Sequence, residues 1–255
     1  MKTGGEFTTD TIIWSADVSK KEIMEVIEAE ALPEGTVIKL DRLFFESESK
    51  DFIDWCENKG YPVFCDAKII EIPIKSIAIA STYLVHSPFM LNIMAGAISS
   101  MNFEQDDDEK KIDALKCFAE ACNAANTRSC VVTVLTSKTE PTCMYEFGTD
   151  PINQVIKYVS IAHNAGITDI VCSPKEAAAI RENPDFDDMM INAPGVRLLD
   201  SSKDDQARVT TPSQALKNGA NRLVIGRDLI RGEGNIVERV TKNYTRILED
   251  IGVEV

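Results

Sequence analysis

The stretch VFCDAKIIEIP, Val63 to Pro73, combines the start of a buried strand with a concentration of charge. Its first residues are β-branched, aromatic and apolar, which is typical of a strand covered on both faces. Asp66, Lys68 and Glu71 then place two acids and a base close together. Because side chains two residues apart in a strand point to the same face, Asp66 and Lys68 are predicted to lie side by side.

The rest of the chain repeats this strand-like pattern, and segments with helical periodicity separate the repeats. The eight predicted strands cover residues 11–17, 36–41, 62–68, 89–95, 130–137, 169–174, 190–196 and 222–228. Helical patterns cover residues 20–30, 110–125 and 151–166, among others. Strands that alternate with helices pair in parallel through right-handed crossovers. Eight such units in 255 residues predict an α/β protein with the (β/α)8 TIM-barrel fold. An open, doubly wound sheet is the alternative arrangement.

Composition limits the class of protein. No Pro-, Gly- or Ser-rich linker divides the chain, so residues 1–255 are expected to form a single (β/α)8 barrel domain. The seven cysteines include no CxxC pair and several lie in apolar runs, which predicts free thiols and a cytoplasmic location. No segment reaches the ~20 apolar residues that span a bilayer, and the N-terminus lacks a signal-peptide pattern.

The formal charge of −14 argues against a nucleic-acid or membrane-surface partner, whose binding surface would be basic. A small anion can still bind where a few Lys and Arg side chains share one pocket. No His/Cys cluster has the spacing of metal ligands. The two histidines, His86 and His163, are expected to be structural.

Polar residues occur at the predicted strand ends, where a barrel of this kind carries its active site. Asp17 comes at the end of the first strand, Lys39 at the end of the second, and Asp66 with Lys68 at the end of the third. Alternating charges on three successive strands predict a constructed site. A salt-bridge network that only closes the barrel is the alternative. Buried ion networks rarely improve stability over apolar packing, so the pattern favours a functional site.

The segment LVIGRDLI around the eighth strand has features of a phosphate site. Gly226 permits close backbone approach, a helix-like start follows it, and Arg227 brings a guanidinium group. The polar segment from Arg197 to Pro212 predicts a long loop, either a lid over the site or a disordered excursion.

Six of these segments together resemble the orotidine 5′-monophosphate decarboxylases, in particular their bacterial branch. DAKIIEIP resembles the D-x-K-x-x-D-I-P signature of that family. The other counterparts occur in the same order: TVLTS (133–137), IVCSPKEAAAIR (170–181), PGVR (194–197), DDQARVTTPSQAL (204–216) and VIGRDLI (224–230). The resemblance extends from Asp17 to Arg227, which is nearly the whole chain.

The resemblance implies a cofactor-free homodimeric enzyme with shared active sites, which removes CO2 from orotidine 5′-monophosphate to give UMP in de novo pyrimidine biosynthesis. It implies that Lys68 protonates C6 of the pyrimidine and that Asp66 is placed against the substrate carboxylate. Lys39 would lie between Asp66 and Asp17, which would bind the ribose hydroxyls. Glu71 falls where the family has an aspartate that reaches into the partner subunit's site.

The remaining predicted substrate contacts come from the later strands and their loops. The resemblance matches Thr136 to a residue that contacts the pyrimidine. It matches Arg197, Gln206, Arg227 and the amide of Gly226 to the phosphate clamp, with Leu198 to Val209 as the lid. Ser137 and Pro194 lie beside these positions and are included among the candidate binding residues.

The chemistry of the residues agrees with these assignments. Loss of CO2 leaves a carbanion, and a fixed ammonium such as that of Lys68 both stabilises the developing charge and supplies a proton. Acids on either side favour the charged form of the lysine. A remote phosphate clamp can supply binding energy for closure of the site.

Three positions depart from the family pattern. Glu71 replaces an aspartate, Lys75 replaces a usual threonine, and Met94 replaces a usual histidine, whereas Asn92 agrees. Lys75 falls near the shared site and is included among the substrate-binding candidates. It is four residues from Glu71, so a local ion pair that retracts the Glu71 carboxylate to about the position of an aspartate is expected if that segment is helical.

Two other functions are left open by the sequence. One is a metal-dependent enzyme on the same scaffold that acts on another sugar phosphate, either a keto-sugar phosphate decarboxylase or an aldolase-like synthase. The other is a non-catalytic nucleotide-binding homologue.

Overall fold

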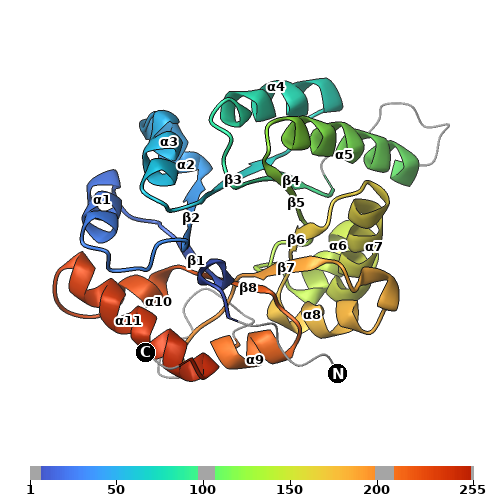
Figure 1. Ribbon diagram of the computed structural model, residues 1–255. Coiled ribbons are helices and arrows are strands. Elements are labelled where there is room, and N and C mark those ends of the chain that lie inside the picture. Colours follow the sequence, from blue (N-terminus) through green and yellow to red (C-terminus); the bar gives the residue numbers. More distant parts are fainter. Residues whose placement is uncertain (1–6, 97–106, 199–209, 254–255) are drawn as a thin grey trace.

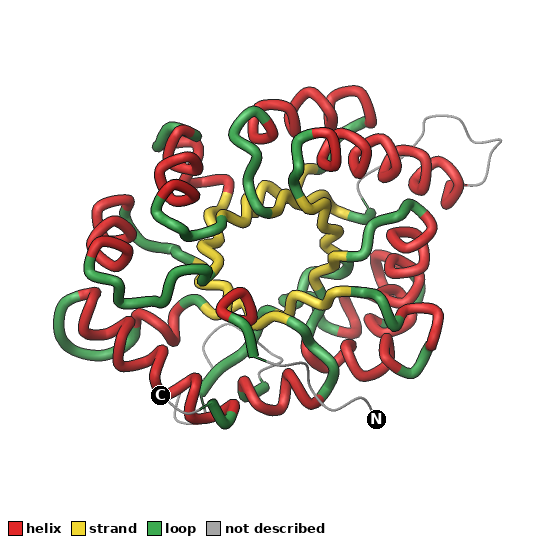
Figure 2. Tube along the Cα trace, viewed as in Figure 1, coloured by secondary structure: helices red, strands yellow, loops and turns green. Residues whose placement is uncertain are grey.

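Eight parallel strands form a closed barrel in sequence order, and the helices surround it (Figures 1 and 2). The computed structural model describes residues 7–96, 107–198 and 210–253. The strands are β1 Ile12–Ser15, β2 Val37–Asp41, β3 Val63–Ile69, β4 Met90–Met94, β5 Arg128–Val132, β6 Asp169–Val171, β7 Met190–Ala193 and β8 Arg222–Ile225. Pairing of Ile12 with Leu223 closes the ring between β1 and β8. The TIM-barrel prediction is therefore confirmed, and the open-sheet alternative is wrong.

Helices follow the strands and cover the outside of the barrel. They are α1 Lys20–Glu28, α2 Arg42–Ser47, α3 Asp51–Asn58, α4 Pro73–Leu84, α5 Asp107–Ala124, α6 Glu140–Phe147, α7 Pro151–Asn164, α8 Pro174–Arg181, α9 Pro212–Lys217, α10 Arg227–Ile230 and α11 Ile236–Ile251. Two short 3-10 helices are η1 Thr9–Thr11 and η2 Pro184–Phe186. Ser19 begins α1 through a capping box with Glu22, and Asn235 does the same for α11 with Glu238. No helix in the described ranges is long and apolar enough to cross a membrane.

The predicted strands are all present, but most of them end earlier than predicted. The fifth runs over Arg128–Val132, so Thr136 and Ser137 lie in the loop that follows it. The sixth ends at Val171, and Ser173 instead caps the N-terminus of α8. The residues after these strands form loops at the carboxyl end of the barrel, which is where the pocket described below opens.

Buried apolar side chains form two separate clusters, one around the barrel and one inside it. The larger core lies between the strands and the helices and includes Trp14, Leu40 and Phe118. A smaller cluster inside the barrel consists of Ile13, Val37, Phe64, Met90, Cys130 and Val224. Side chains on alternate strand positions supply it, as expected for a barrel interior. This inner layer closes the barrel below the pocket.

An ion network closes the opposite, amino-terminal end of the barrel. Arg222 donates to Asp10 at 2.9 Å and to Asp169 at 3.0 Å. Arg128 contacts the same Asp169 at 2.8 Å, and both guanidinium groups lie over the ring of Phe89. These residues stand at or before the first positions of their strands, so the network is remote from the strand ends that carry the pocket.

Candidate active site

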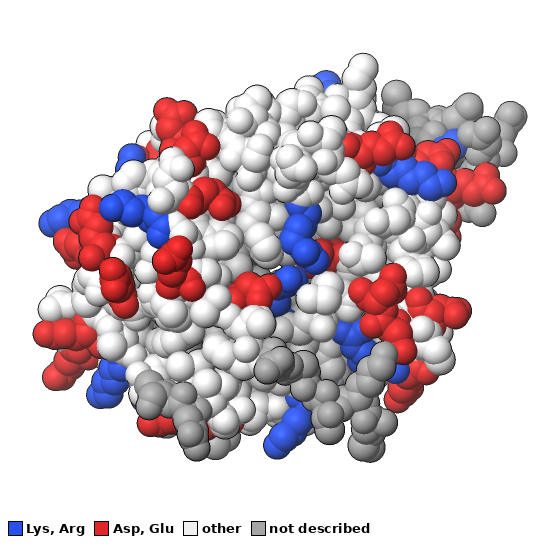
Figure 3. Space-filling model, in the orientation of Figure 1, with Lys and Arg blue, Asp and Glu red and all other residues white. Residues whose placement is uncertain are grey.

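A pocket of about 250 Å³ opens at the carboxyl ends of the strands. Every strand of the barrel, or the loop after it, contributes to the lining: Ser15, Asp17, Lys39, Phe64, Asp66, Lys68, Asn92, Val132, Val134, Leu135, Thr136, Val171, Pro194, Gly195, Arg197, Val224, Gly226 and Arg227. Figure 3 shows acidic and basic side chains next to one another at the centre of the face seen along the barrel axis. The lining of the pocket therefore combines apolar and charged side chains.

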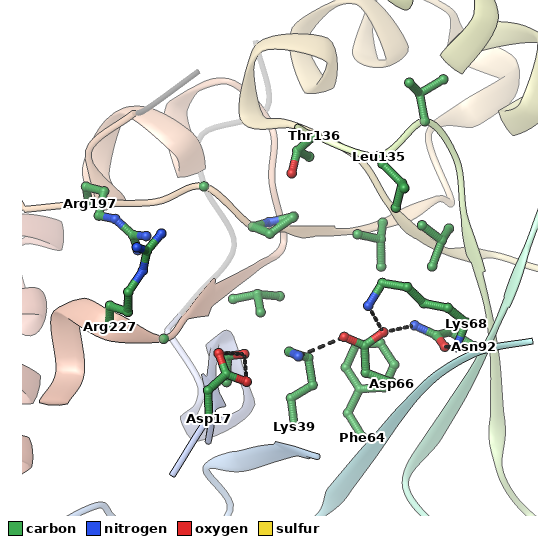
Figure 4. Close-up of a pocket in the computed structure, with 18 residues that line it drawn as sticks. Asp17, Lys39, Phe64, Asp66, Lys68, Asn92, Leu135, Thr136, Arg197 and Arg227 are labelled. Atoms are coloured by element: carbon green, nitrogen blue, oxygen red, sulfur yellow. Dashed lines mark hydrogen bonds and ion pairs between the residues drawn. The ribbon is translucent and has the colours of Figure 1, made fainter. Parts of the chain in front are cut away.

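Asp66 is the centre of the charged cluster. Its Oδ2 accepts a hydrogen bond from Lys39 Nζ at 2.7 Å, and its Oδ1 accepts one from Lys68 Nζ at 2.6 Å. The amide of Asn92 donates to the same Oδ1 at 2.7 Å. Asp66 and Lys39 are buried, whereas the side chain of Lys68 is 44% exposed (Figure 4). Lys68 is therefore the cation of the cluster that reaches the open pocket.

The two lysines determine the charge state of Asp66. Burial alone would raise the pKa of this carboxyl, but the ammonium groups of Lys39 and Lys68, and the hydrogen bonds that they donate, hold its pKa well below the usual range. Asp66 is consequently a permanent carboxylate at neutral pH. A carboxylate in this state keeps a cation oriented beside it.

Asp17 lies in the same pocket on the other side of Lys39 (Figure 4). Its carboxylate accepts from the hydroxyl of Ser15 at 3.3 and 3.4 Å. Within the described residues, hydrogen bonds join Lys39 to Asp66 but not to Asp17. The predicted order of alternating charges is therefore present, and direct ion pairs join Lys39 to Asp66 and Asp66 to Lys68.

Two arginines occupy the opposite end of the pocket. Arg197 follows β7 and Arg227 begins α10, and Figure 4 shows their guanidinium groups close together. Gly226 stands between β8 and α10, and a Cβ at this position would lie 3.3 Å from the side chain of Ser15. A glycine therefore allows β1 and the start of α10 to approach each other. Two guanidinium groups beside the backbone of a glycine suit a phosphate group.

The structure brings most of the predicted site residues together. The pocket contains Asp17, Lys39, Asp66, Lys68, Thr136, Pro194, Arg197, Gly226 and Arg227. Ser137 is exposed in the loop after β5 and does not line it. Gln206 and most of the predicted lid, Leu198 to Val209, lie outside the described residues.

Glu71 and Lys75 do not form the expected ion pair. The helix α4 begins at Pro73, and Ile72 before it has an extended backbone, so Glu71 lies outside the helix. The carboxylate of Glu71 instead accepts from the amide of Ile72 at 3.2 Å. Neither residue lines the pocket of its own chain. The prediction of a local pair that retracts the Glu71 carboxylate is wrong, because four-residue spacing brings side chains together only inside a helix.

Asn92 is the main residue that the sequence predictions left out of the site. It is polar at an alternate position of the apolar strand β4 and is almost fully buried. A single buried amide in such a strand was a signal that could have been used. Met94, two residues further, ends β4 and does not line the pocket.

Among the described residues, one group of side chains has the donor atoms to hold a cation, and it lies outside the pocket. Atoms of Asp51, Asp54 and His86 lie within 4.8 Å of one another. His86 Nδ1 is 2.9 Å from an Asp54 carboxylate oxygen, so the two already pair. None of the three lines the pocket. His163 approaches Asp188 and the ring of Phe186, and neither histidine lines the pocket.

The fold and the pocket define a class of protein: a (β/α)8 barrel with a lysine–aspartate–lysine cluster and an arginine pair at opposite ends of one cavity. The model of the orotidine 5′-phosphate decarboxylase / HUMPS family matches residues 10–242. The chain belongs to this family. The sequence prediction is thus confirmed at the level of the family.

Curated relatives carry the decarboxylase name. The orotidine 5′-phosphate decarboxylase of Syntrophomonas wolfei is 32% identical over 239 residues, which cover 91% of this chain and 95% of the relative. That of Moorella thermoacetica is 33% identical over 225 residues, covering 86% of this chain and 85% of the relative. A solved structure of the Lactobacillus acidophilus enzyme of the same name has a TM-score of 0.71 at 20% identity, covering 95% of this chain and 99% of that one. At this identity the solved structure supports the fold.

Proposed function

We propose that this protein decarboxylates orotidine 5′-monophosphate to UMP in pyrimidine biosynthesis. The observation that carries the proposal is the Lys39–Asp66–Lys68 cluster, which shares one pocket with the Arg197–Arg227 pair. The curated names of its relatives support the same activity. The family description also names a second group, HUMPS, so the family match by itself does not choose the substrate.

Lys68 is the proposed proton donor. The bond between C6 and the carboxylate breaks, CO2 leaves, and the electron pair remains on C6. The ammonium of Lys68 stabilises that charge as it forms and then transfers a proton to C6, which leaves a neutral amine. Its partly exposed side chain can regain a proton from solvent before the next turnover.

Asp66 and Lys39 are proposed to hold this donor in place. Asp66 fixes the Lys68 ammonium at 2.6 Å and would lie against the substrate carboxylate. Lys39 balances the buried charge of Asp66 from the other side at 2.7 Å. Preorganised charges of this kind lower the barrier because they need no reorganisation during the reaction.

The arginine pair is proposed to bind the phosphate, and Asp17 the ribose hydroxyls. Binding energy from a phosphate far from C6 can hold the pyrimidine against the cluster. Thr136, from the loop after β5, is the proposed pyrimidine contact. Gln206 is proposed to belong to the phosphate clamp on the basis of the family resemblance alone.

We also propose a homodimer with shared active sites. Ile70, Ile72 and Ile74 are 61%, 47% and 77% exposed and follow Lys68 directly in the chain. Three exposed isoleucines in one short segment at the barrel mouth suit a second copy of the chain. Glu71 and Lys75 lie in the same segment, so docking there would carry them toward the partner's pocket. None of the seven cysteines, all of which are among the described residues, forms a disulfide, which supports a reducing, cytoplasmic setting.

Turnover of orotidine 5′-monophosphate by the purified protein tests the proposal. Wild type should be active with EDTA present, and Lys68→Ala should lose several orders of magnitude in kcat. Lys68→Ala should still bind UMP, because the arginine pair is intact. Lys59→Ala, an exposed lysine remote from the pocket, is the matched control and should remain active.

The competing functions predict other results. A metal-dependent enzyme for another sugar phosphate would lose activity in EDTA. A nucleotide-binding homologue without catalysis would bind UMP tightly and leave the absorbance of orotidine 5′-monophosphate unchanged. Either result would overturn the decarboxylase proposal.

A further inference from the structure

The pairing of strands β3 and β4 shifts register in the segment that contains Lys68. Cys65 pairs with Leu91, but the next pair joins Ile69 to Ile93. Four residues of β3 therefore span the distance that two residues span on β4. The bulged segment contains both Asp66 and Lys68, and Lys68 adopts a positive φ of 42°. This backbone region is unfavourable for a residue with a side chain, so the surroundings must hold Lys68 there.

The side chain of Asn92 occupies the gap that the bulge leaves in the ladder. Its Oδ1 accepts from the backbone amide of Lys68 at 2.7 Å. Its Nδ2 donates to Asp66 Oδ1, also at 2.7 Å. One side-chain amide, 1% exposed, thus contacts the backbone of the proposed proton donor and the carboxylate that orients it.

The hydrogen bonds that Asp66 accepts suggest how the contact with Asn92 acts during the proposed reaction. Oδ2 is held by Lys39, while Oδ1 is shared between Lys68 and Asn92. When Lys68 moves toward the substrate or loses a proton, Oδ1 keeps its bond to Asn92. The carboxylate then stays in place, and Lys68 can return to it.

We propose that Asn92 is a positioning residue for proton transfer: it fixes the bulged backbone of Lys68 and the carboxylate of Asp66 through one side chain. The assignment rests on the proposed decarboxylase function. It predicts an effect on the chemical step rather than on binding, because the phosphate-binding arginines lie at the other end of the pocket.

Asn92→Ala removes both hydrogen bonds. We expect a loss of kcat of about 100-fold or more, the size of effect seen when a reacting group is misplaced by about 1 Å. The KM and the affinity for UMP should change little. Asn192→Ala is the matched control, since Asn192 is equally buried and donates to the carbonyl of Ile170 outside the pocket. It should lower stability and leave kcat nearly unchanged.

The activity of Asn92→Asp should depend on pH, because the introduced carboxyl can be protonated or ionised. A protonated carboxyl can donate to Asp66 and accept from the Lys68 amide, as the Asn92 side chain does. An ionised carboxyl has no proton to donate and repels the carboxylate of Asp66. The charged groups that line the pocket around position 92 are Asp66, Lys68, Lys39 and Asp17. The thiol of Cys130, opposite on β5, stays neutral because burial raises its pKa well above the usual value. The kcat of Asn92→Asp relative to wild type should therefore be higher at pH 5 than at pH 8.

Amide hydrogen exchange of Lys68, followed by NMR, tests the contact without any turnover. Exchange should be faster in Asn92→Ala than in wild type and Asn192→Ala. If wild type does not turn over orotidine 5′-monophosphate, the decarboxylase proposal fails, and this exchange measurement alone then decides whether Asn92 holds Lys68. An unchanged exchange rate, or an Asn92→Ala kcat equal to that of Asn192→Ala, would overturn the assignment.

Discussion

Asp228 lies behind Arg197 and holds it in the wall of the pocket. Its Oδ1 is 3.7 Å from the Nε of Arg197, and its Oδ2 accepts a hydrogen bond from the backbone amide of Leu198 at 2.7 Å. Both side chains are almost completely buried. The carboxylate also lies 3.7 Å from Arg231. The buried carboxylate of Asp228 thus positions Arg197, which is proposed to bind the substrate phosphate. Asp228 also follows directly after Arg227 in the chain.

Replacing Asp228 by Asn should destabilise the ligand-free protein by about 3 kcal/mol, because it removes a buried negative charge that lies 3.7 Å from both Arg197 and Arg231. The amide oxygen of Asn can still accept from Leu198. A bound phosphate would supply the missing negative charge, so UMP should raise the melting temperature of Asp228→Asn by more than that of wild type. Thermal unfolding with and without UMP measures both effects.

A second variant controls for the loss of a carboxylate that caps a backbone amide. Asp250 accepts from the amide of Ser213 at 2.8 Å and does not line the pocket. Asp250→Asn should therefore show the same UMP-induced shift as wild type. Equal shifts in all three proteins would show that Asp228 does not act on the phosphate site.

The charged cluster could be predicted from the sequence through two regular features of the fold. The two-residue period of a strand predicts Asp66 and Lys68 on one side, and their ion pair is present although a bulge interrupts that period. Parallel pairing of consecutive strands then brings β2 beside β3, with Asp41 opposite Asp66 and Lys39 two positions earlier. Parallel pairing is a property of the fold class, so the fold prediction carried the Lys39–Asp66 contact with it.

Other features depend on details that no local pattern contains. The positive φ of Lys68 and the hydrogen bond from its amide to Asn92 occur at a register shift between β3 and β4. The pair of Glu71 and Lys75 failed for a reason that the sequence does contain. Proline favours the first position of a helix and disfavours a helical residue before it, so Pro73 marks the start of α4.

The stability of the cluster should depend on pH through Asp66. Its folded-state pKa is lowered, so its contribution to stability is present above the ordinary carboxyl pKa of about 4 and is lost as the pH falls below it. Asp66→Asn should be less stable than wild type by about 3 kcal/mol at pH 7, because Lys39 stays buried without a counter-charge. In urea unfolding, the difference in free energy of unfolding between wild type and Asp66→Asn should decrease between pH 5 and pH 3.

A double variant provides the control for that measurement. Lys39→Met with Asp66→Asn removes the buried cation as well, and should recover part of the stability that Asp66→Asn loses. A gap between wild type and Asp66→Asn that stays constant from pH 7 to pH 3 would contradict the assignment of the pH dependence to Asp66.

The isoleucines after β3 should control assembly if they form the proposed interface. Ile74→Glu places a charge at the most exposed of the three and should shift the protein toward monomers in analytical ultracentrifugation. Activity should then fall at low protein concentration and recover as the concentration rises. Val85→Glu is the matched control, since Val85 is 75% exposed at the other end of α4. It should leave both the mass and the activity unchanged.

Mixing two inactive variants tests whether the active sites are shared. Lys68→Ala removes the proposed proton donor from one pocket, and Glu71→Ala removes the acid that is proposed to reach into the partner's pocket. Each homodimer should have low activity. A hybrid dimer has one pocket that lacks both groups and one that contains the intact Lys68 of one chain and the intact Glu71 of the other. Random exchange of subunits in an equal mixture would restore about a quarter of all pockets. Activity that rises after mixing, with the time course of subunit exchange, would place Glu71 in the partner's site, whereas an additive mixture would confine its action to its own chain.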